Sequence, residues 1–152
     1  TSYIQATAWL RLIRSFGSEN RLIARLNAGA TSSSNFFELP PTVRFFAGGD
    51  ESVRGFDYNS LGPKDAEGKV IGGENLLVAS VEYERHLHGN FYGAVFVDAG
   101  NAFDDTDFDP EVGTGLGLKW RSPLGPIRLY LGYPLTADDP GIRLHLRLGA
   151  DL

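Results

Sequence analysis

The chain has 152 residues and a formal net charge of −5, and it contains neither Cys nor Met. That length suits one domain or part of one, the acidic balance argues against a nucleic-acid partner, and the absence of Cys excludes disulfides and thiolate chemistry. Because the chain starts at Thr1 and has no Met, we expect a processed product or a piece of a longer protein. No apolar run approaches the roughly 18 residues of a membrane-spanning helix, but a spanning strand needs only about 10 residues of alternating pattern.

Apolar and polar residues alternate with a period of two along most of the chain, as β-strands with two different faces require. The alternation predicts strands at about 3–16, 21–28, 77–86, 91–100, 113–121, 127–132 and 142–148. In the last of these, one face carries Ile142, Leu144, Leu146 and Leu148. Short turns follow the first, third and fifth strands, and longer loops follow the second, fourth and sixth. Such an arrangement is typical of an antiparallel transmembrane β-barrel, here a meander of about seven strands.

The fifth predicted strand has one face without side chains, because Gly113, Gly115 and Gly117 occupy every second position. Glycine weakens a strand unless another backbone approaches it closely. We therefore expect a segment of the chain to fold into the lumen of the barrel and to lie against this glycine face.

The longest connection, from about residue 31 to residue 73, is the candidate for that segment. Connections of this length within a compact chain are usually functional or disordered. Its centre reads Val53-Arg54-Gly55-Phe56, a cation on a flexible backbone between two apolar side chains. The aromatic residues Phe45, Phe46 and Tyr58 flank this motif, so we expect the loop to pack against another surface.

A buried Arg54 would need a carboxylate partner, because an unpaired buried charge is costly. Strand parity places Glu82 and Asp98 on the polar faces of two neighbouring antiparallel strands. A guanidinium can bind such a carboxylate through two parallel hydrogen bonds. We interpret these three residues as a structural clasp and not as a catalytic site.

Several short sequences combine in an order and spacing that a known family shares. They are Gly48-Gly49-Asp50 before Val53–Phe56, Gly72-Gly73-Glu74-Asn75, Ser80-Val81-Glu82-Tyr83, Phe96–Phe103, Gly113–Gly117, Ser122–Pro126 and the closing stretch Arg143–Leu152. The chain resembles the C-terminal barrel portion of the outer-membrane protein assembly superfamily, which includes BamA-like, TamA-like and two-partner secretion proteins. Its ending, Leu148 to Leu152, is more similar to the TamA-like members, because the BamA-like members end on an aromatic residue.

The resemblance implies a barrel of about sixteen strands, of which residues 1–152 would be the C-terminal part. The first strands and the periplasmic POTRA domains would lie outside this chain. In the family the loop enters the lumen and its Arg contacts acidic residues on the inner wall, which by motif position would be Glu82 and Asp98. The closing strand, 142–148, would pair weakly with the missing first strand and form a lateral seam, where client strands add to the edge.

The function that this resemblance implies is the insertion or translocation of proteins such as autotransporters at the bacterial outer membrane. The implied partners are the lipid bilayer, client β-barrel or autotransporter polypeptides, and a periplasmic protein anchored in the inner membrane. The resemblance implies no cofactor, no metal and no catalytic residues. A strand number of seven leaves two open edges, which a bilayer does not tolerate, so we expect copies of this piece to self-associate if it folds alone.

Other function classes remain open. A two-partner-secretion transporter, a structural or pore-forming outer-membrane barrel and a soluble β-sandwich binding module would all show alternating strands. An enzyme barrel would need a clustered acid, base and nucleophile, which the sequence does not show. The histidines, His86, His88 and His145, are too scattered to indicate a metal site.

Overall fold

The computed structural model describes residues 1–149 and contains one antiparallel sheet in which every strand pairs with the next. Its strands are β1 (Tyr3–Phe16), β2 (Asn20–Ser33), β3 (Asn75–His88), β4 (Phe91–Phe103), β5 (Glu111–Ser122), β6 (Gly125–Pro134) and β7 (Arg143–Leu148). The predicted all-β meander is confirmed. Two short 3₁₀ helices, η1 (Phe36–Glu38) and η2 (Pro41–Val43), follow β2. Within residues 1–149, no helix has the length and apolar character needed to cross a membrane.

Most strands extend a few residues beyond the ranges that the alternation predicts, and the differences in β2 and β7 affect the loop and the closing strand. Strand β2 continues to Ser33, so the long connection comprises residues 34–74 and does not begin near Thr31. Residues 31–33 pair with β1, and the backbone N–H of Thr31 donates to the carbonyl of Glu74. Side-chain alternation does not show such backbone pairing, so it predicts an earlier end for the strand. Strand β7 begins at Arg143 and leaves out Ile142. The predicted closing stretch runs on to Leu152, but residues 150–152, and with them most of the ending that resembles TamA, lie outside the described residues.

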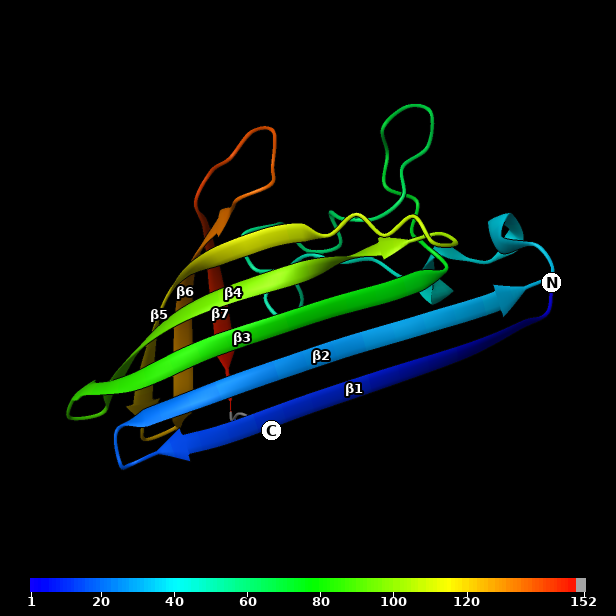
Figure 1. The fold of residues 1–152 in the computed structure, drawn as a ribbon. Helices are drawn as coiled ribbons and strands as arrows, with labels where there is room; N and C mark the ends of the chain where they lie inside the picture. Colours follow the sequence, from blue (N-terminus) through cyan, green and yellow to red (C-terminus); the bar gives the residue numbers. More distant parts are fainter. Residues whose placement is uncertain (150–152) are drawn as a thin grey trace.

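The sheet is strongly curved, and the cyan part of the connection 34–74 that follows η2 lies on its concave side (Figure 1). The green part projects beyond the end of the sheet (Figure 1). Within this connection, Ala47 and Leu61 exchange two backbone hydrogen bonds of 3.0 Å. We call residues 47–61, which these bonds close at the base, the motif loop. The concave side of the sheet, against which this loop packs, is called the inner face below.

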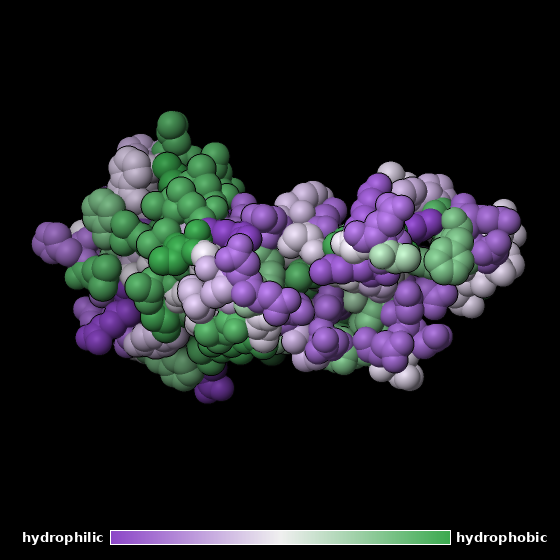
Figure 2. All heavy atoms as spheres, turned by 90° about the horizontal axis from the view of Figure 1, so that it is seen from above, coloured by the Kyte–Doolittle hydropathy of each residue, from purple (hydrophilic) through white to green (hydrophobic). Residues whose placement is uncertain are grey.

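The outer face of the sheet is apolar and exposed. Its larger side chains include Val81, Tyr83, Val95, Val97, Leu116, Leu118, Trp120, Leu129, Leu131, Tyr133, Leu144, Leu146 and Leu148. Figure 2 shows apolar residues gathered over the strands and hydrophilic residues over the region of the long loops. A contiguous apolar surface of this extent marks a membrane or protein interface.

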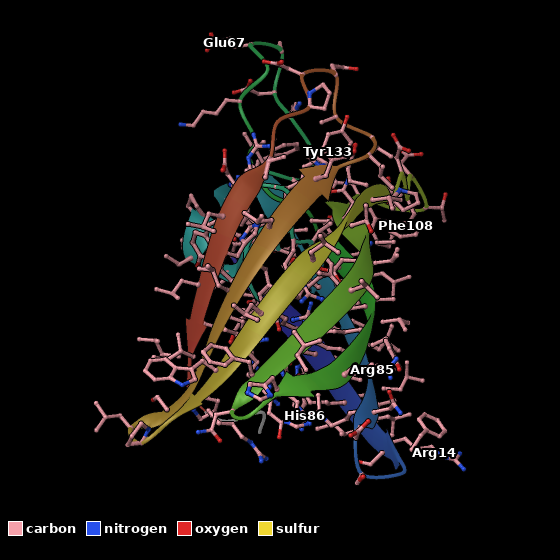
Figure 3. The ribbon with its side chains drawn as sticks, turned by 90° about the vertical axis from the view of Figure 1, so that its left-hand side faces the viewer. Arg14, Glu67, Arg85, His86, Phe108 and Tyr133 are labelled. Carbon is pink, nitrogen blue, oxygen red and sulfur yellow. The ribbon has the colours of Figure 1, made fainter. Side chains whose placement is uncertain are left out.

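The two ends of the sheet differ in the length of their connections. Residues 17–19, 89–90 and 123–124 form the short turns, whereas residues 34–74, 104–110 and 135–142 form the long loops. Figure 3 places Glu67 at the tip of the longest loop, Phe108 and Tyr133 at the long-loop end, and Arg14 and His86 at the short-turn end. The predicted alternation of short turns and long loops is confirmed.

Candidate functional site

Several glycines of the motif loop have backbone conformations that other residues rarely adopt. Gly48, Gly49 and Gly55 all have φ near +100°, in the left-handed region that favours glycine. At Gly55 space is restricted as well, because a Cβ there would lie 3.0 Å from the backbone carbon of Tyr133. The loop therefore folds tightly enough to bring the backbone of its central motif directly against the inner face of the sheet.

The two apolar residues of the motif, Val53 and Phe56, are buried in a small core beneath the loop. They pack with Ala47 of the loop and with Val78, which β3 points inward. Burying side chains of this size is worth about 1.5–3 kcal/mol each. Tyr58 does not join them and is 82% exposed, so the expectation that it packs is wrong. It lies beside a solvent-open hollow next to the end of β7, which is also lined by Leu146 and Leu148.

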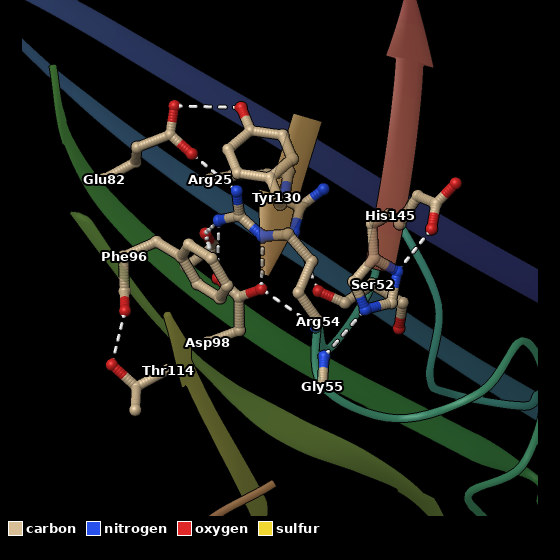
Figure 4. A network of polar contacts seen from close by, with 12 residues as sticks. Arg25, Ser52, Arg54, Gly55, Glu82, Phe96, Asp98, Thr114, Tyr130 and His145 are labelled. Atoms are coloured by element: carbon tan, nitrogen blue, oxygen red, sulfur yellow. Dashed lines mark hydrogen bonds and ion pairs between the residues drawn. The ribbon is translucent and has the colours of Figure 1, made fainter. Parts of the chain in front are cut away.

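Arg54, between these two apolar residues, reaches β3 and β4 through a dense set of hydrogen bonds (Figure 4). Its Nε and Nη2 donate to the two carboxylate oxygens of Asp98 at 2.7 and 2.8 Å, and its backbone N–H donates to Asp98 Oδ2 at 2.9 Å. Its Nη1 lies 2.5 Å from Glu82 Oε1, and its Nη2 lies 3.1 Å from Ser80 Oγ. The structure thus brings together Arg54, Glu82 and Asp98. We call this group, with Ser80, the inner anchor.

Two aromatic rings enclose the guanidinium of Arg54. Its central carbon lies 3.8 Å from the ring centre of Phe96 and 4.6 Å from that of Tyr130, and the two rings meet edge to face. Tyr130 also donates its hydroxyl to Glu82 Oε2 at 3.2 Å. Desolvated cation–π contacts of this kind contribute about 2 kcal/mol. The rings therefore exclude water from the ion pairs and also stabilise the cation.

The electrostatics of the inner anchor keep Arg54 charged. Burial by itself lowers the pKa of the guanidinium, but the hydrogen bonds and charges of Asp98 and Glu82 outweigh it and raise the pKa above its ordinary value. A cation with a raised pKa stabilises the folded state at every pH below its ordinary pKa. The arrangement holds a loop in place, and it offers no water-exposed nucleophile or acid for chemistry.

Only one residue of the predicted glycine face lies against the motif loop. A Cβ on Gly113 would be 1.8 Å from the carbonyl oxygen of Arg54, so this position requires glycine. A Cβ on Gly115 would lie 1.9 Å from the carbonyl oxygen of Leu131 in β6 and 2.8 Å from the ring of Phe96, and a Cβ on Gly117 would lie 2.5 Å from the ring of Tyr130. A close backbone neighbour is therefore present at Gly113 and Gly115, but only at Gly113 does it come from the motif loop, and Gly115 and Gly117 also leave room for the rings that enclose Arg54.

A second set of contacts joins the motif loop to the terminal strand β7. Arg143 donates through Nε to Asp57 at 2.9 Å and through Nη1 to the carbonyl of Gly55 at 3.1 Å. His145 accepts the N–H of Gly55 at 3.0 Å and contacts Asp50, and Arg147 donates to Glu51 at 3.2 Å. We call these contacts the edge anchor. The outward residues of the predicted seam, Leu144, Leu146 and Leu148, lie on the other side of the strand and are exposed, as is Ile142 before it.

Sequence reasoning missed several residues that hold the loop, chiefly Ser80, Phe96, Tyr130 and His145. The alternation indicated the inward direction of each, but not which of them would meet the motif loop. That information lies in the curvature of the sheet, which brings β6 and β7 towards β3 and β4 across the concave side. No group of three or more His, Cys, Asp or Glu suited to a metal ion occurs among residues 1–149.

Comparison with known proteins identifies a family over almost the whole chain. Residues 1–151 match the Omp85 superfamily domain. The outer membrane protein assembly factor BamA of Nitratidesulfovibrio vulgaris is 32% identical over 128 residues, which cover 79% of this chain and 16% of that protein. BamA of Neisseria meningitidis serogroup B is 28% identical, covering 74% of this chain and 19% of that protein. The chain therefore spans about a fifth or less of the length of these relatives.

A solved structure shares the fold. The crystal structure of BamA from Haemophilus ducreyi, determined without POTRA domains 1–3, superimposes with a TM-score of 0.77. It is 23% identical, and the match covers 95% of this chain and 34% of that one. At this identity the likeness concerns the arrangement of the strands.

Proposed function

The chain belongs to the Omp85 superfamily, and from that premise we propose that it is the C-terminal part of a membrane barrel that inserts or translocates outer-membrane proteins. We assign it to the bacterial outer membrane as an integral protein, because the outer face is apolar and the inner face carries the charges. Spanning strands with this distribution of side chains are characteristic of outer-membrane barrels. POTRA domains and the first strands of the barrel would belong to the complete protein.

The proposal rests on one observation: strand β7 has a free edge and lies beside the docked motif loop. Strand β7 pairs with β6 on one side, and no strand among residues 1–149 covers its other edge. A free edge presents unpaired N–H and C=O groups to which another strand can add. In the complete barrel this edge would form a lateral seam with the first strand, and a client strand would enter there.

The finer assignments are parts of the proposal. We propose that the clients include autotransporters or other β-barrel proteins, as in TamA-like members, and that a periplasmic protein anchored in the inner membrane assists. The BamA-named relatives support assembly of outer-membrane proteins in general. A two-partner-secretion transporter would use the same loop and lumen for an extended polypeptide. Separated from its barrel, the seven-stranded piece would associate with copies of itself through its open edges.

A charge reversal in the motif loop tests the proposal. Arg54→Glu in the complete protein places a third carboxylate against Asp98 and Glu82, so the loop should leave the inner face. Lys69→Glu is the matched control, because it reverses an exposed charge in the same connection. Insertion of a client barrel into lipid vesicles, followed by protease protection, is measured for both variants.

We expect Arg54→Glu to lose at least tenfold in insertion rate, and Lys69→Glu to keep the rate of the parent protein. A pore or structural barrel gives no role to the docked loop, so insertion unchanged by Arg54→Glu would contradict the proposal. Folding of the barrel itself is checked by the shift in electrophoretic mobility on heating, since a variant that does not fold says nothing about insertion.

A further inference from the structure

Every inward side chain of β7 contacts the motif loop. Arg143, His145 and Arg147 occupy alternate positions on the inner face, and each bonds to a residue between Asp50 and Asp57. On its paired side, β7 is held to β6 over the six residues from Arg143 to Leu148. The loop is therefore the main tertiary support of this short strand within the described residues.

His145 is the buried member of this set, with 5% of its side chain exposed. The backbone N–H of Gly55 can only donate, so Nε2 of His145, 3.0 Å away, must accept and carry no proton. The proton of the neutral ring then lies on Nδ1, which donates to the carboxylate of Asp50. One neutral tautomer satisfies both contacts.

The position of Gly55 makes this hydrogen bond a direct connection between the two anchors. Gly55 follows Arg54, whose carbonyl lies against Gly113 of β5 and whose guanidinium binds β3 and β4. A Cβ on Gly132 of β6 would lie 2.5 Å from the nitrogen of Gly55, so the backbone of the motif runs tightly between the sheet and His145. The Gly55–His145 hydrogen bond therefore joins the centre of the motif loop directly to β7.

We propose that His145 is a positioning residue that couples the motif loop to the terminal strand, so that the docked loop fixes β7 and loss of the Gly55–His145 hydrogen bond frees the strand edge. This inference rests on the proposed function, because the edge it controls is the one to which client strands would add. It assigns the coupling to one imidazole in its neutral form and not to the ion pairs around it.

Protonation of His145 breaks the coupling, because both ring nitrogens then carry protons and neither can accept the N–H of Gly55. The contact with Asp50 remains possible in that state. Several charged and titratable groups face this region from every element packed around it. They are Asp50, Glu51, Arg54 and Asp57 of the motif loop, Arg11 of β1, Arg25 of β2, Glu82 of β3, Arg128 and Tyr130 of β6, and Arg143 and Arg147 of β7 itself. A proton on Nε2 should therefore release the N–H of Gly55 and loosen the loop.

The test uses the complete protein in lipid vesicles. Double electron–electron resonance measures the distance between two nitroxide labels, one of them on the loop. Labels are attached at Tyr58→Cys on the loop and Leu124→Cys in the turn between β5 and β6, which are 82% and 100% exposed. A second pair, at Leu124→Cys and Leu135→Cys, flanks the two ends of β6 (Gly125–Pro134) and reports on that strand without the motif loop. Each pair is measured in the parent protein, His145→Gln and His145→Ala, at about pH 7.5 and about pH 5.

Glutamine provides an uncharged acceptor near the position of Nε2 but cannot be protonated. It therefore separates the ability of the side chain to accept a hydrogen bond from its ability to take up a proton. We expect a narrow loop-to-turn distance at neutral pH that broadens at low pH in the parent protein. His145→Gln should stay narrow at both pH values, and His145→Ala should be broad at both. The second pair should not change in any of them.

Two results would overturn the proposal: a narrow distance in His145→Ala, or the same broadening with pH in the parent protein and in His145→Gln. Client insertion by the same variants separates this proposal from the proposed function. If the distances follow the proposal but insertion never changes with them, the coupling is correct and the assembly function is wrong.

Discussion

The motif loop is held at two places on the sheet that differ in the burial of their acidic partners. In the inner anchor, the side chains of Asp98 and Glu82 are 0% and 5% exposed. In the edge anchor, Asp50, Asp57 and Glu51 are 44%, 72% and 79% exposed. The arginines differ in the same direction, with Arg54 at 3% and Arg143 at 33%.

This difference means that the two anchors have different strengths although their chemistry is similar. Removing one partner of a buried ion pair costs about 3–5 kcal/mol, because a charge is left without compensation. Exposed pairs contribute about 0–1 kcal/mol, because water and salt screen them. The inner anchor should therefore hold Arg54 in place permanently, while the parts of the loop that the edge anchor binds can leave β7 and return at little cost.

The largest effect is expected for Arg54→Ala in the complete protein. It removes the cation that binds the buried carboxylates of Asp98 and Glu82, so we expect a loss of about 3–5 kcal/mol in the free energy of unfolding. Denaturant titration followed by tryptophan fluorescence measures it. Arg143→Ala, in the edge anchor, is the comparison and should lose about 1 kcal/mol or less. Equal losses would remove the distinction between the two anchors.

A smaller effect is expected for Gly113→Ala, which removes no charge but occupies the space of the Arg54 carbonyl. Overpacking of this kind costs about 1–3 kcal/mol, and the loop has to move away from β5 to relieve it. Gly141→Ala is the matched control, because a Cβ there meets nothing within 4 Å. Limited proteolysis of the motif loop should be faster in Gly113→Ala only. Protection equal to that of the parent would show that the close approach is not required.

A further reduced effect is expected for Tyr130→Phe, which keeps the ring over Arg54 and removes the hydroxyl that donates to Glu82. A hydrogen bond to a charged group is worth about 1.5–3 kcal/mol, and the 3.2 Å distance favours the lower end. Tyr133→Phe, on the outer face, serves as control and should change thermal stability little. A Tyr130→Phe protein with the parent's stability would limit Tyr130 to a packing role.

The smallest effect is expected for Glu51→Gln, which removes the exposed partner of Arg147. The free energy of unfolding should change by less than about 1 kcal/mol, and the change should shrink further when salt is added. Measurement at low and high ionic strength tests both statements. A loss as large as that of Arg54→Ala would mean that the edge anchor is as strong as the inner anchor.

Much of the architecture could be predicted from the sequence, because side-chain alternation is a local property of each strand. The first strand was predicted with the boundaries that the structure shows, Tyr3–Phe16, and the order of short turns and long loops is the same. Strand ends such as those of β2 were less accurate, because they depend on backbone pairing with β1 and with Glu74. Parity also assigned Glu82 and Asp98 to one face of neighbouring strands.

The sequence by itself determined the two faces of the sheet, its connections and a central motif, Val53–Phe56, that had to be buried. Only the tertiary structure decided where this motif lies. The curvature of the sheet brings Phe96 and Tyr130 over Arg54 and aligns His145 with Gly55, although 90 residues separate the last two in the chain. Alternation fixes the direction in which a side chain points, but its partner across a concave sheet depends on the twist and closure of all the strands between them.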